Sequence, residues 1–273
     1  MLKTRILTAL VLLACFIPAL FYLPVIPWAF LMLLISLLAL YEWSGMLALS
    51  NSVFYVYMSL GVLLGLATLY LMNRVGLHTF FQQSIHLYIL VALFWCVIVP
   101  VWLAKSWVVK NRIVLMALGL FLIGVLWLAL VSAKWLSPWA LLIIVSIIWI
   151  ADTAAYFSGK NFGKHKLAPS ISPGKTWEGV WGALIANTIF ALFLLYIDVV
   201  DSWVVVPAIW LITAVGIYGD LFESMFKRQA NIKDSGRLLP GHGGVLDRID
   251  GIVPALPIGV LMLYSYHYLQ SVF

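Results

Sequence analysis

The chain has 273 residues, of which 64% are hydrophobic and only 10% are charged, and its formal net charge is +6. A soluble globular domain of this length needs far more charge on its surface, so the composition excludes one. The mean hydropathy of +1.09 instead predicts an all-α polytopic membrane protein, because each spanning helix needs roughly 20 apolar residues. The two cysteines, Cys15 and Cys96, lie in apolar runs and indicate no disulfide or metal framework.

The N-terminus, MLKTRILTALVLLACF, has the basic start and apolar stretch that also describe a signal peptide. Its LLAC segment, residues 12–15, resembles a weak lipoprotein cleavage box. The apolar run nevertheless continues through IPALFYLPVIPWAFLMLLISLLAL without the polar start of a mature protein. We therefore predict an uncleaved first membrane span.

Apolar runs separated by charged or turn residues predict about nine membrane spans, with boundaries good to a few residues. Pro18, Pro24 and Pro27 fall in the first two runs, so a broken or re-entrant pair is the alternative there. The predicted spans are residues 5–23, 26–49, 52–73, 85–104, 112–132, 136–157, 178–198, 202–222 and 252–271.

Basic residues fall almost entirely on one side of this predicted topology. With a cytoplasmic N-terminus, all of the 16 Lys and Arg residues except Arg74 and Lys134 lie in cytoplasmic segments. The positive-inside rule therefore predicts that orientation. A basic face of this kind suits anionic lipid headgroups or anionic soluble ligands.

Acidic residues divide the chain into two unequal halves. Glu42 is the only acid before residue 150, whereas nine of the ten acids follow it. Of these nine, only Asp198 and Asp201 are predicted to face outward. We predict that residues 1–150 form an N-terminal transmembrane scaffold and residues 151–273 a C-terminal transmembrane catalytic half, not two separable soluble domains.

The first polar stretch of the second half is IADTAAYFSGKNFGKHK, residues 150–166. Asp152 lies within the sixth predicted span, one helical turn from Tyr156. A carboxylate at that depth is costly unless it faces protein or water, so either a functional site or a helix-packing hydrogen bond would explain it. Gly159 and Gly163, beside lysines, would let backbone approach a phosphate, although this pattern alone is weak.

The second polar stretch is SPGKTWEG, residues 172–179, which opens the seventh predicted span. Its GKT segment is not a P-loop, because position 169 is Pro instead of Gly and no buried strand precedes it. A turn, Lys175 and a helix N-terminus remain, and together these features can hold an anion. The alternative is a plain loop whose lysine obeys the positive-inside rule.

The third polar stretch begins at the end of the eighth predicted span. Asp220, Glu223, Ser224 and Lys227 follow the helical spacing i, i+3, i+4 and i+7, so they form one polar stripe. Asp247 and Asp250 are likewise three residues apart and begin the ninth span. Two helix ends can thus present carboxylates to one cytoplasmic pocket, and oxygen ligands among cations fit Mg²⁺ with phosphates.

The connection between these two spans is rich in glycine. Gly241, Gly243 and Gly244 leave room for close backbone approach, and His242 between them either donates to a phosphate oxygen or caps the turn. A zinc site is a poor explanation, because the stretch has one histidine and no cysteine.

The third stretch carries a family resemblance over 27 residues, 224–250. It resembles the full signature of the phosphatidate cytidylyltransferases, also called CDP-diacylglycerol synthases, and the DTAAY-x₂-GK and SPGKTWEG segments resemble that family as well. The first half agrees only as a set of membrane spans. The matching positions are Ser224-x-Phe226-Lys227-Arg228-x₄-Lys233-Asp234-x-Gly236-x₂-Leu239-Pro240-x-His242-Gly243-Gly244-Val245-x-Asp247-Arg248-Ile249-Asp250.

The resemblance implies transfer of CMP from CTP to phosphatidate, giving CDP-diacylglycerol and pyrophosphate. It implies Mg²⁺ held by Asp220 and Asp247, in a multi-pass protein of a bacterial inner membrane whose active site faces the cytoplasm. A second cation and a homodimer stay open, and no nucleic-acid partner is expected. The implied catalytic residues are Asp220, Asp247, Asp250, Lys227, Arg248 and His242, and the implied substrate-binding residues are Asp152, Tyr156, Lys175, Ser224, Arg228, Lys233, Asp234, Gly243 and Gly244.

Two other functions are compatible with parts of this pattern. A CTP-dependent polyprenol or phytol kinase would use the same nucleotide in the same membrane, but it would transfer the γ-phosphoryl group and release CDP. An ion-coupled transporter would also need intramembrane acids, usually near the bilayer midplane in both repeat halves. Here the acids cluster at one face of one half, which favours the nucleotidyltransferase.

Overall fold

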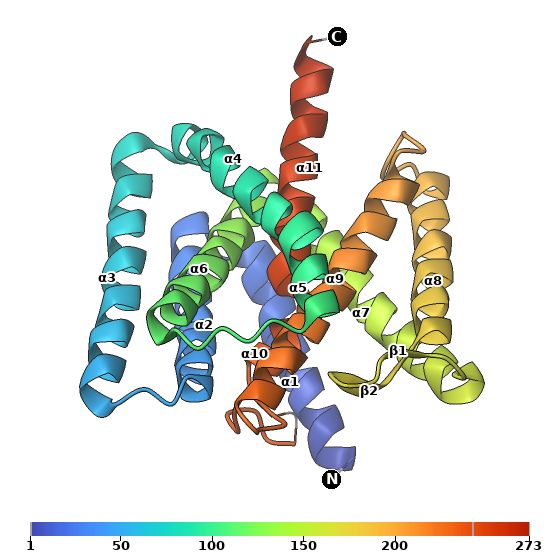
Figure 1. Cartoon of the computed structure of the whole chain (residues 1–273). Helices are drawn as coiled ribbons and strands as arrows, with labels where there is room; N and C mark the ends of the chain where they lie inside the picture. Colours follow the sequence, from blue (N-terminus) through green and yellow to red (C-terminus); the bar gives the residue numbers. More distant parts are fainter. Residues whose placement is uncertain (1, 242, 273) are drawn as a thin grey trace.

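The computed structural model describes residues 2–241 and 243–272, with side chains for residues 7–241 and 243–266. Helices and one short hairpin account for its elements (Figure 1). The helices are α1 (Leu2–Tyr22), α2 (Val25–Met46), α3 (Asn51–Val75), α4 (Leu77–Leu93), the π-helix η1 (Phe94–Ile98), α5 (Val99–Lys105), α6 (Arg112–Leu136), α7 (Pro138–Phe162), α8 (Trp177–Tyr196), α9 (Val205–Gln229), α10 (Leu246–Ile249) and α11 (Ile252–Val272), and the strands are β1 (Lys166–Ala168) and β2 (Ser172–Thr176).

The helices have the length and composition of membrane spans. Among the residues with described side chains, eight helical segments are long and apolar enough to cross a bilayer, and Leu7–Tyr22 is a shorter apolar helix. The predicted all-α polytopic membrane class is therefore confirmed. The prolines of the first two spans do not produce a broken pair, because α1 continues through Pro18 and Pro24 separates it from α2.

The fourth predicted span differs most from its expected limits. It was expected to begin at residue 85, but α4 begins at Leu77 and the helical segment continues through η1 and α5 to Lys105. Pro100 lies in the first turn of α5, directly after the π-turn. Because proline has no backbone N–H and clashes with the preceding turn, it accounts for this local change of helical pitch.

The connection between α7 and α8 is a small antiparallel hairpin, which the apolar pattern did not predict. Strands β1 and β2 pair with the register Lys166↔Thr176 and Ala168↔Ser172. At its end, the Thr176 hydroxyl accepts a hydrogen bond from Gly179 N and so caps α8. The hairpin thereby directs Lys175 back toward α9 instead of leaving it on an open loop.

Helices α2 and α6 are joined by two buried tryptophans that point in opposite directions. Trp28 Nε1 donates to Leu130 O at 3.1 Å, and Trp127 Nε1 donates to Ala29 O at 2.9 Å. Each indole thus places apolar surface in the core while its polar N–H is satisfied by a neighbouring helix. Helices α9 and α11 pack at the centre of the bundle, beside α6 and α7 (Figure 1).

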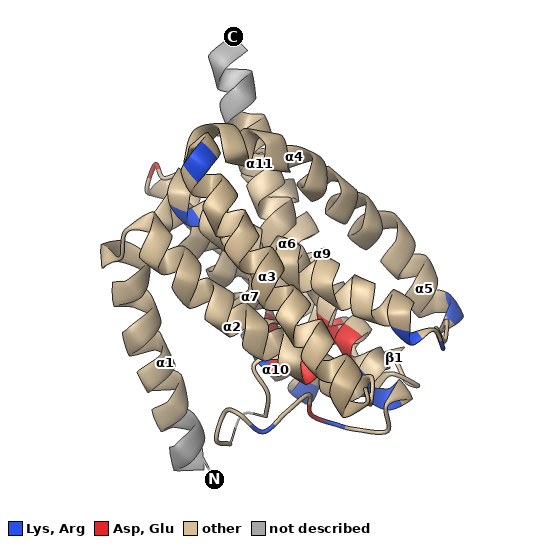
Figure 2. Cartoon of the chain, turned by 90° about the vertical axis from the view of Figure 1, so that its left-hand side faces the viewer, with Lys and Arg blue, Asp and Glu red and all other residues tan. Residues whose placement is uncertain are grey.

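Charged residues gather at one end of the bundle. Figure 2 shows acidic positions beside α10 and between the central helices, with basic positions on the loops around them. The ends of α7, α9 and α5 and the start of α10 all lie there (Figure 1). We call this the charged end, and we call residues 230–245, which connect α9 to α10, the signature loop.

Candidate active site

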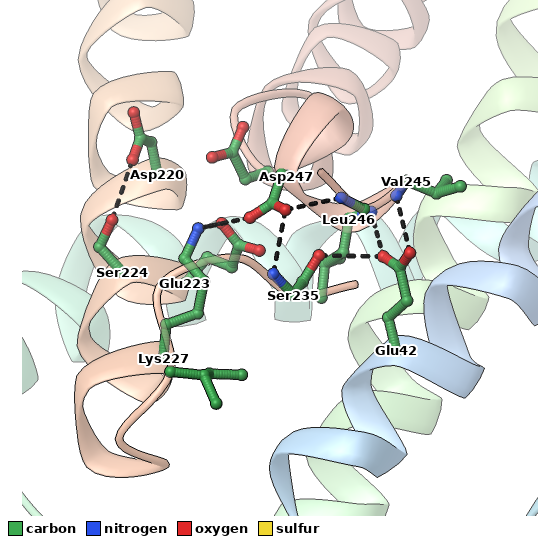
Figure 3. Close-up of polar contacts among 12 residues, drawn as sticks. Glu42, Asp220, Glu223, Ser224, Lys227, Ser235, Val245, Leu246 and Asp247 are labelled. Atoms are coloured by element: carbon green, nitrogen blue, oxygen red, sulfur yellow. Dashed lines mark hydrogen bonds and ion pairs between the residues drawn. The ribbon is translucent and has the colours of Figure 1, made fainter. Parts of the chain in front are cut away.

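Lys227, near the end of α9, links two carboxylates from different parts of the chain. Its Nζ donates to Glu223 Oε2 at 2.7 Å, one turn earlier in α9, and to Asp247 Oδ1 at 2.6 Å, in α10 (Figure 3). These three side chains are at most 11% exposed. Because a buried charge is costly without a partner, each member of this trio requires the others.

Asp247 also organises the signature loop. Its Oδ2 accepts hydrogen bonds from Ser235 N at 3.0 Å and from Gly244 N at 2.8 Å (Figure 3). The loop is further closed by Leu239 N, which donates to Gly243 O at 2.9 Å. Gly243 has a φ of +85°, a conformation that glycine adopts without steric cost. Gly243 and Gly244 therefore allow the loop to fold around the Asp247 carboxylate.

Asp220 has an ion pair of a different kind. Lys175, from strand β2, places its Nζ 2.7 Å from Asp220 Oδ2, and the Ser224 hydroxyl donates to Asp220 Oδ1 at 3.2 Å. The Asp220 side chain is 32% exposed and that of Lys175 is 24% exposed. A pair that reaches solvent in this way contributes little to stability and can exchange partners.

Three aspartates from three helical segments lie near one another at this point. Asp250, between α10 and α11, is within electrostatic range of Asp220, Glu223 and Asp152. Asp152, on α7, is within range of Asp220 as well as of Lys175 and Arg248. We call Asp152, Asp220 and Asp250 the three-aspartate cluster. The structure thus brings together the acids that the sequence predicted from three separate stretches.

Other predicted residues lie around this centre in different settings. Arg228 donates to Ile171 O at 3.4 Å and Ile232 O at 3.3 Å, so it ties the hairpin turn to the signature loop. Lys233, Asp234 and Arg248 are exposed at the charged end. Tyr156 is exposed on α7, with Lys160 Nζ 5.8 Å from its ring centroid. The prediction for His242 lies outside the described residues.

Glu42 is a site residue that sequence reasoning missed. Although it comes from α2, in the half predicted to be a scaffold, its carboxylate accepts hydrogen bonds from Val245 N at 2.9 Å and Leu246 N at 2.8 Å (Figure 3). The Ser235 hydroxyl also donates to it, at 3.0 Å. Its status as the only acid in the first 150 residues was the available signal.

The carboxylate oxygens of the site are ligands that suit a hard cation. Glu223 Oε1 is buried and, within the described part of the chain, has no hydrogen-bond partner. It lies near Asp250, and carboxylate oxygens are the ligands that Mg²⁺ prefers. Among the described residues, however, no group of three or more His, Cys, Asp and Glu side chains forms a ready-made metal site. The predicted Mg²⁺ ligands, Asp220 and Asp247, therefore remain a prediction.

Comparison with known sequences places this geometry in context. Residues 3–266 match the model of the Cytidylyltransferase family. The chain is 36% identical to a phosphatidate cytidylyltransferase of Haemophilus influenzae, over 98% of this chain and 99% of that protein. It is 44% identical to one of Pseudomonas aeruginosa over 55% of this chain and 57% of the relative, and 47% identical to one of Staphylococcus aureus over 44% and 47%.

Proposed function

The chain belongs to the cytidylyltransferase family and is a nucleotidyltransferase, and we propose that it transfers CMP from CTP to the phosphate of phosphatidate. The products would be CDP-diacylglycerol and pyrophosphate, a step of phospholipid synthesis. The observation that carries this proposal is the position of the three-aspartate cluster, with Lys175 beside it, at one end of the membrane helices. A nucleotide in water and a lipid phosphate in the bilayer can meet only at such an end.

The reaction places modest demands on proton transfer. An oxygen of the phosphatidate phosphate forms a bond to the α-phosphorus of CTP. The bond from that phosphorus to the oxygen that joins the α- and β-phosphates breaks. Pyrophosphate leaves with the electron pair. A phosphate monoester has a second pKa of about 6, so the attacking oxygen is largely anionic at neutral pH and needs no strong general base. Bringing two polyanions together in line is the larger task.

We assign Mg²⁺ to this site, with Asp220 and Asp247 as its protein ligands. A carboxylate offers about four lone-pair positions. Asp220 uses them for Lys175 and Ser224, and Asp247 for Lys227, Ser235 N and Gly244 N, so both keep capacity for a cation. Mg²⁺ bound there supplies positive charge that offsets the charge of the phosphates.

The basic residues of the charged end would hold the substrate phosphates. Lys175 is the best placed, because its partner Asp220 is partly exposed and the pair can open without leaving a buried charge. Arg248 and Lys233 are exposed nearby and would neutralise phosphate oxygens. Lys227 would act by holding Asp247 in place. His242, Asp152, Asp250 and Tyr156 keep their predicted roles as part of this proposal.

The proposed location is a bacterial inner membrane, with the charged end in the cytoplasm. The distribution of Lys and Arg supports this orientation, since all but two of these residues are predicted on one side. CTP is a cytoplasmic nucleotide, so the same orientation gives the site access to it. A homodimer is compatible with the proposal but is not required by it.

Labelled CTP tests the proposed reaction directly. Purified protein is incubated with phosphatidate and CTP carrying radiolabel at the α-phosphate or, separately, at the γ-phosphate, with and without Mg²⁺. We expect α-label in the lipid extract, γ-label in pyrophosphate, and neither without Mg²⁺. Transfer of γ-label to a lipid with release of CDP would contradict the proposal and identify a lipid kinase.

A further inference from the structure

Glu42 is buried in an unusual way for a carboxylate in a membrane helix. Glu42 is only 2% exposed. Its carboxylate accepts three hydrogen bonds, from Ser235 Oγ, Val245 N and Leu246 N. A buried polar group is costly unless it is hydrogen-bonded, and these three donors meet that need for Glu42. All three donors belong to the signature loop or to the first residue of α10, so Glu42 joins α2 to these segments.

Ser235 connects this carboxylate to the proposed metal ligand. The Ser235 hydroxyl donates to Glu42 Oε2, while its backbone N donates to Asp247 Oδ2. Gly244 N donates to the same Oδ2, and the next two backbone N–H groups, of Val245 and Leu246, donate to Glu42. Consecutive backbone donors are thus shared between the two carboxylates, so the position of Asp247 depends on that of Glu42.

The loop is shaped to admit the Glu42 carboxylate. A Cβ atom at Gly236 or at Gly244 would collide with the side chain of Glu42. Larger residues at either position would therefore displace the carboxylate or open the loop. The two glycines thus explain how a loop of the second half fits closely around an acid of the first.

Helix α2 contacts both α9 and α6 at the level of Trp43. Trp43, the residue after Glu42, packs edge-on against Phe226 with ring centroids 5.1 Å apart, and its Nε1 donates to Leu115 O at 3.0 Å. Phe226 precedes Lys227, the partner of Asp247. Glu42 and Lys227 therefore approach the signature loop from two helices that touch through Trp43 and Phe226, which supports the site from both sides.

We infer that Glu42 is a positioning residue, which holds the signature loop so that Asp247 presents its carboxylate to the reaction centre. Its effect passes through its hydrogen bonds with Ser235, Val245 and Leu246. The inference rests on the proposed function for its kinetic consequence, but the ordering of the loop is measurable without any turnover.

The test compares Glu42→Gln with a stability control in the same helix. Gln keeps the shape but replaces one acceptor oxygen by an NH₂ group, which opposes a donor in the loop. Trp28→Phe removes the buried hydrogen bond to Leu130 O, far from the loop, and serves as the control. Amide hydrogen exchange of residues 235–246 and steady-state kinetics are measured for both variants.

We expect Glu42→Gln to increase exchange at Val245 and Leu246 at least about tenfold and to lower kcat about 30-fold, with KM for CTP changed less than about threefold. Trp28→Phe should lower Tm but leave the loop exchange and kcat near wild type. Wild-type exchange and kcat in Glu42→Gln would overturn the inference, as would equal kinetic losses in the two variants.

A milder variant covers the case in which Glu42→Gln does not fold. Ser235→Ala removes one of the three donors to Glu42 and should lower kcat about threefold, with faster exchange at the neighbouring amides. An unchanged Ser235→Ala variant would then overturn the inference. If wild type fails to transfer CMP, the proposed function fails, while the exchange result still tests the loop.

Discussion

Glu42 and Asp220 are carboxylates at the same charged end, yet the protein surrounds them in opposite ways. Glu42 is 2% exposed and accepts three hydrogen bonds from the signature loop and α10. The Asp220 side chain is 32% exposed and is paired with a lysine from a surface hairpin. A buried carboxylate that accepts several internal hydrogen bonds organises the fold, whereas a carboxylate in a solvent-reaching pair has oxygens that a ligand can approach. Asp247 is buried like Glu42, with a side chain that is 6% exposed, and we assign it a ligand role as well as a structural one.

The largest effect is expected at Asp247, because it organises the signature loop and is also a proposed Mg²⁺ ligand. Asp247→Asn would lose the ion pair with Lys227 and weaken the contacts to Ser235 N and Gly244 N. We expect activity to fall by more than about 100-fold, about 2.7 kcal/mol in the barrier, and the free energy of unfolding to fall by about 1–3 kcal/mol. CMP-transfer assays and thermal unfolding in detergent measure the two losses. Loss of stability alone would remove Asp247 from the metal site.

Asp220→Asn separates the two roles, because the polar contacts of Asp220 within the described residues are with Lys175 and Ser224, outside the signature loop. Activity should fall by about 100-fold at saturating Mg²⁺, again about 2.7 kcal/mol, while Tm stays near wild type. Asp198→Asn is the matched control, since Asp198 lies outside the charged end and Asn tolerates its φ of +55°. An Asp220→Asn variant with more than about a tenth of wild-type activity would refute its role as an essential ligand.

Lys175 should matter for substrate binding more than for stability. Lys175→Ala removes the 2.7 Å pair with Asp220, and a partly exposed pair contributes about 1 kcal/mol or less to folding. We expect kcat/KM to fall about tenfold, mainly through KM, with Tm unchanged. Lys166→Ala, on the partner strand of the same hairpin, should remain near wild type. Equal losses in both variants would point to general surface charge instead.

The smallest perturbation tests only on which side of the membrane the hairpin and the signature loop lie. Single cysteines replace Ser170 in the hairpin turn and Arg237 in the signature loop, in a background without Cys15 and Cys96. Both should react with impermeant thiol reagents only from the cytoplasmic side and retain activity. A cysteine replacing Val199, which is exposed on the α8–α9 connection, should react only from outside. Reversed labelling would overturn the proposed orientation.

Sequence alone predicted the membrane architecture and the polar stripe of α9. Hydropathy identifies spanning helices because each must be apolar along its length, and the spacing of Asp220, Glu223 and Lys227 places them on one helix face. Periodicity does not report tertiary contacts, so it could not reveal that Glu42 meets residues more than 190 positions away. The β1–β2 hairpin was missed because its strands have three and five residues.

The division into a scaffold half and a catalytic half remains a prediction, and the contacts of Glu42 show what such a division leaves out. The distribution of charge predicted that the second half carries the chemistry. A single acid among apolar residues gave no pattern to interpret, although a lone carboxylate in a membrane helix is costly without a partner. That cost was the one physical reason to search for a partner of Glu42.

Cation binding tests the difference between Asp220 and Glu42 most directly, without relying on turnover. Mn²⁺ serves as a spectroscopic substitute for Mg²⁺, and its binding is titrated by electron paramagnetic resonance in wild type, Asp220→Asn, Glu42→Gln and Asp198→Asn. We predict that Asp220→Asn weakens Mn²⁺ binding at least about tenfold, about 1.4 kcal/mol. Glu42→Gln should weaken Mn²⁺ binding less than Asp220→Asn does, because it shifts the ligand Asp247 without removing a ligand, and Asp198→Asn should be unchanged. Wild-type Mn²⁺ affinity in Asp220→Asn would contradict the account.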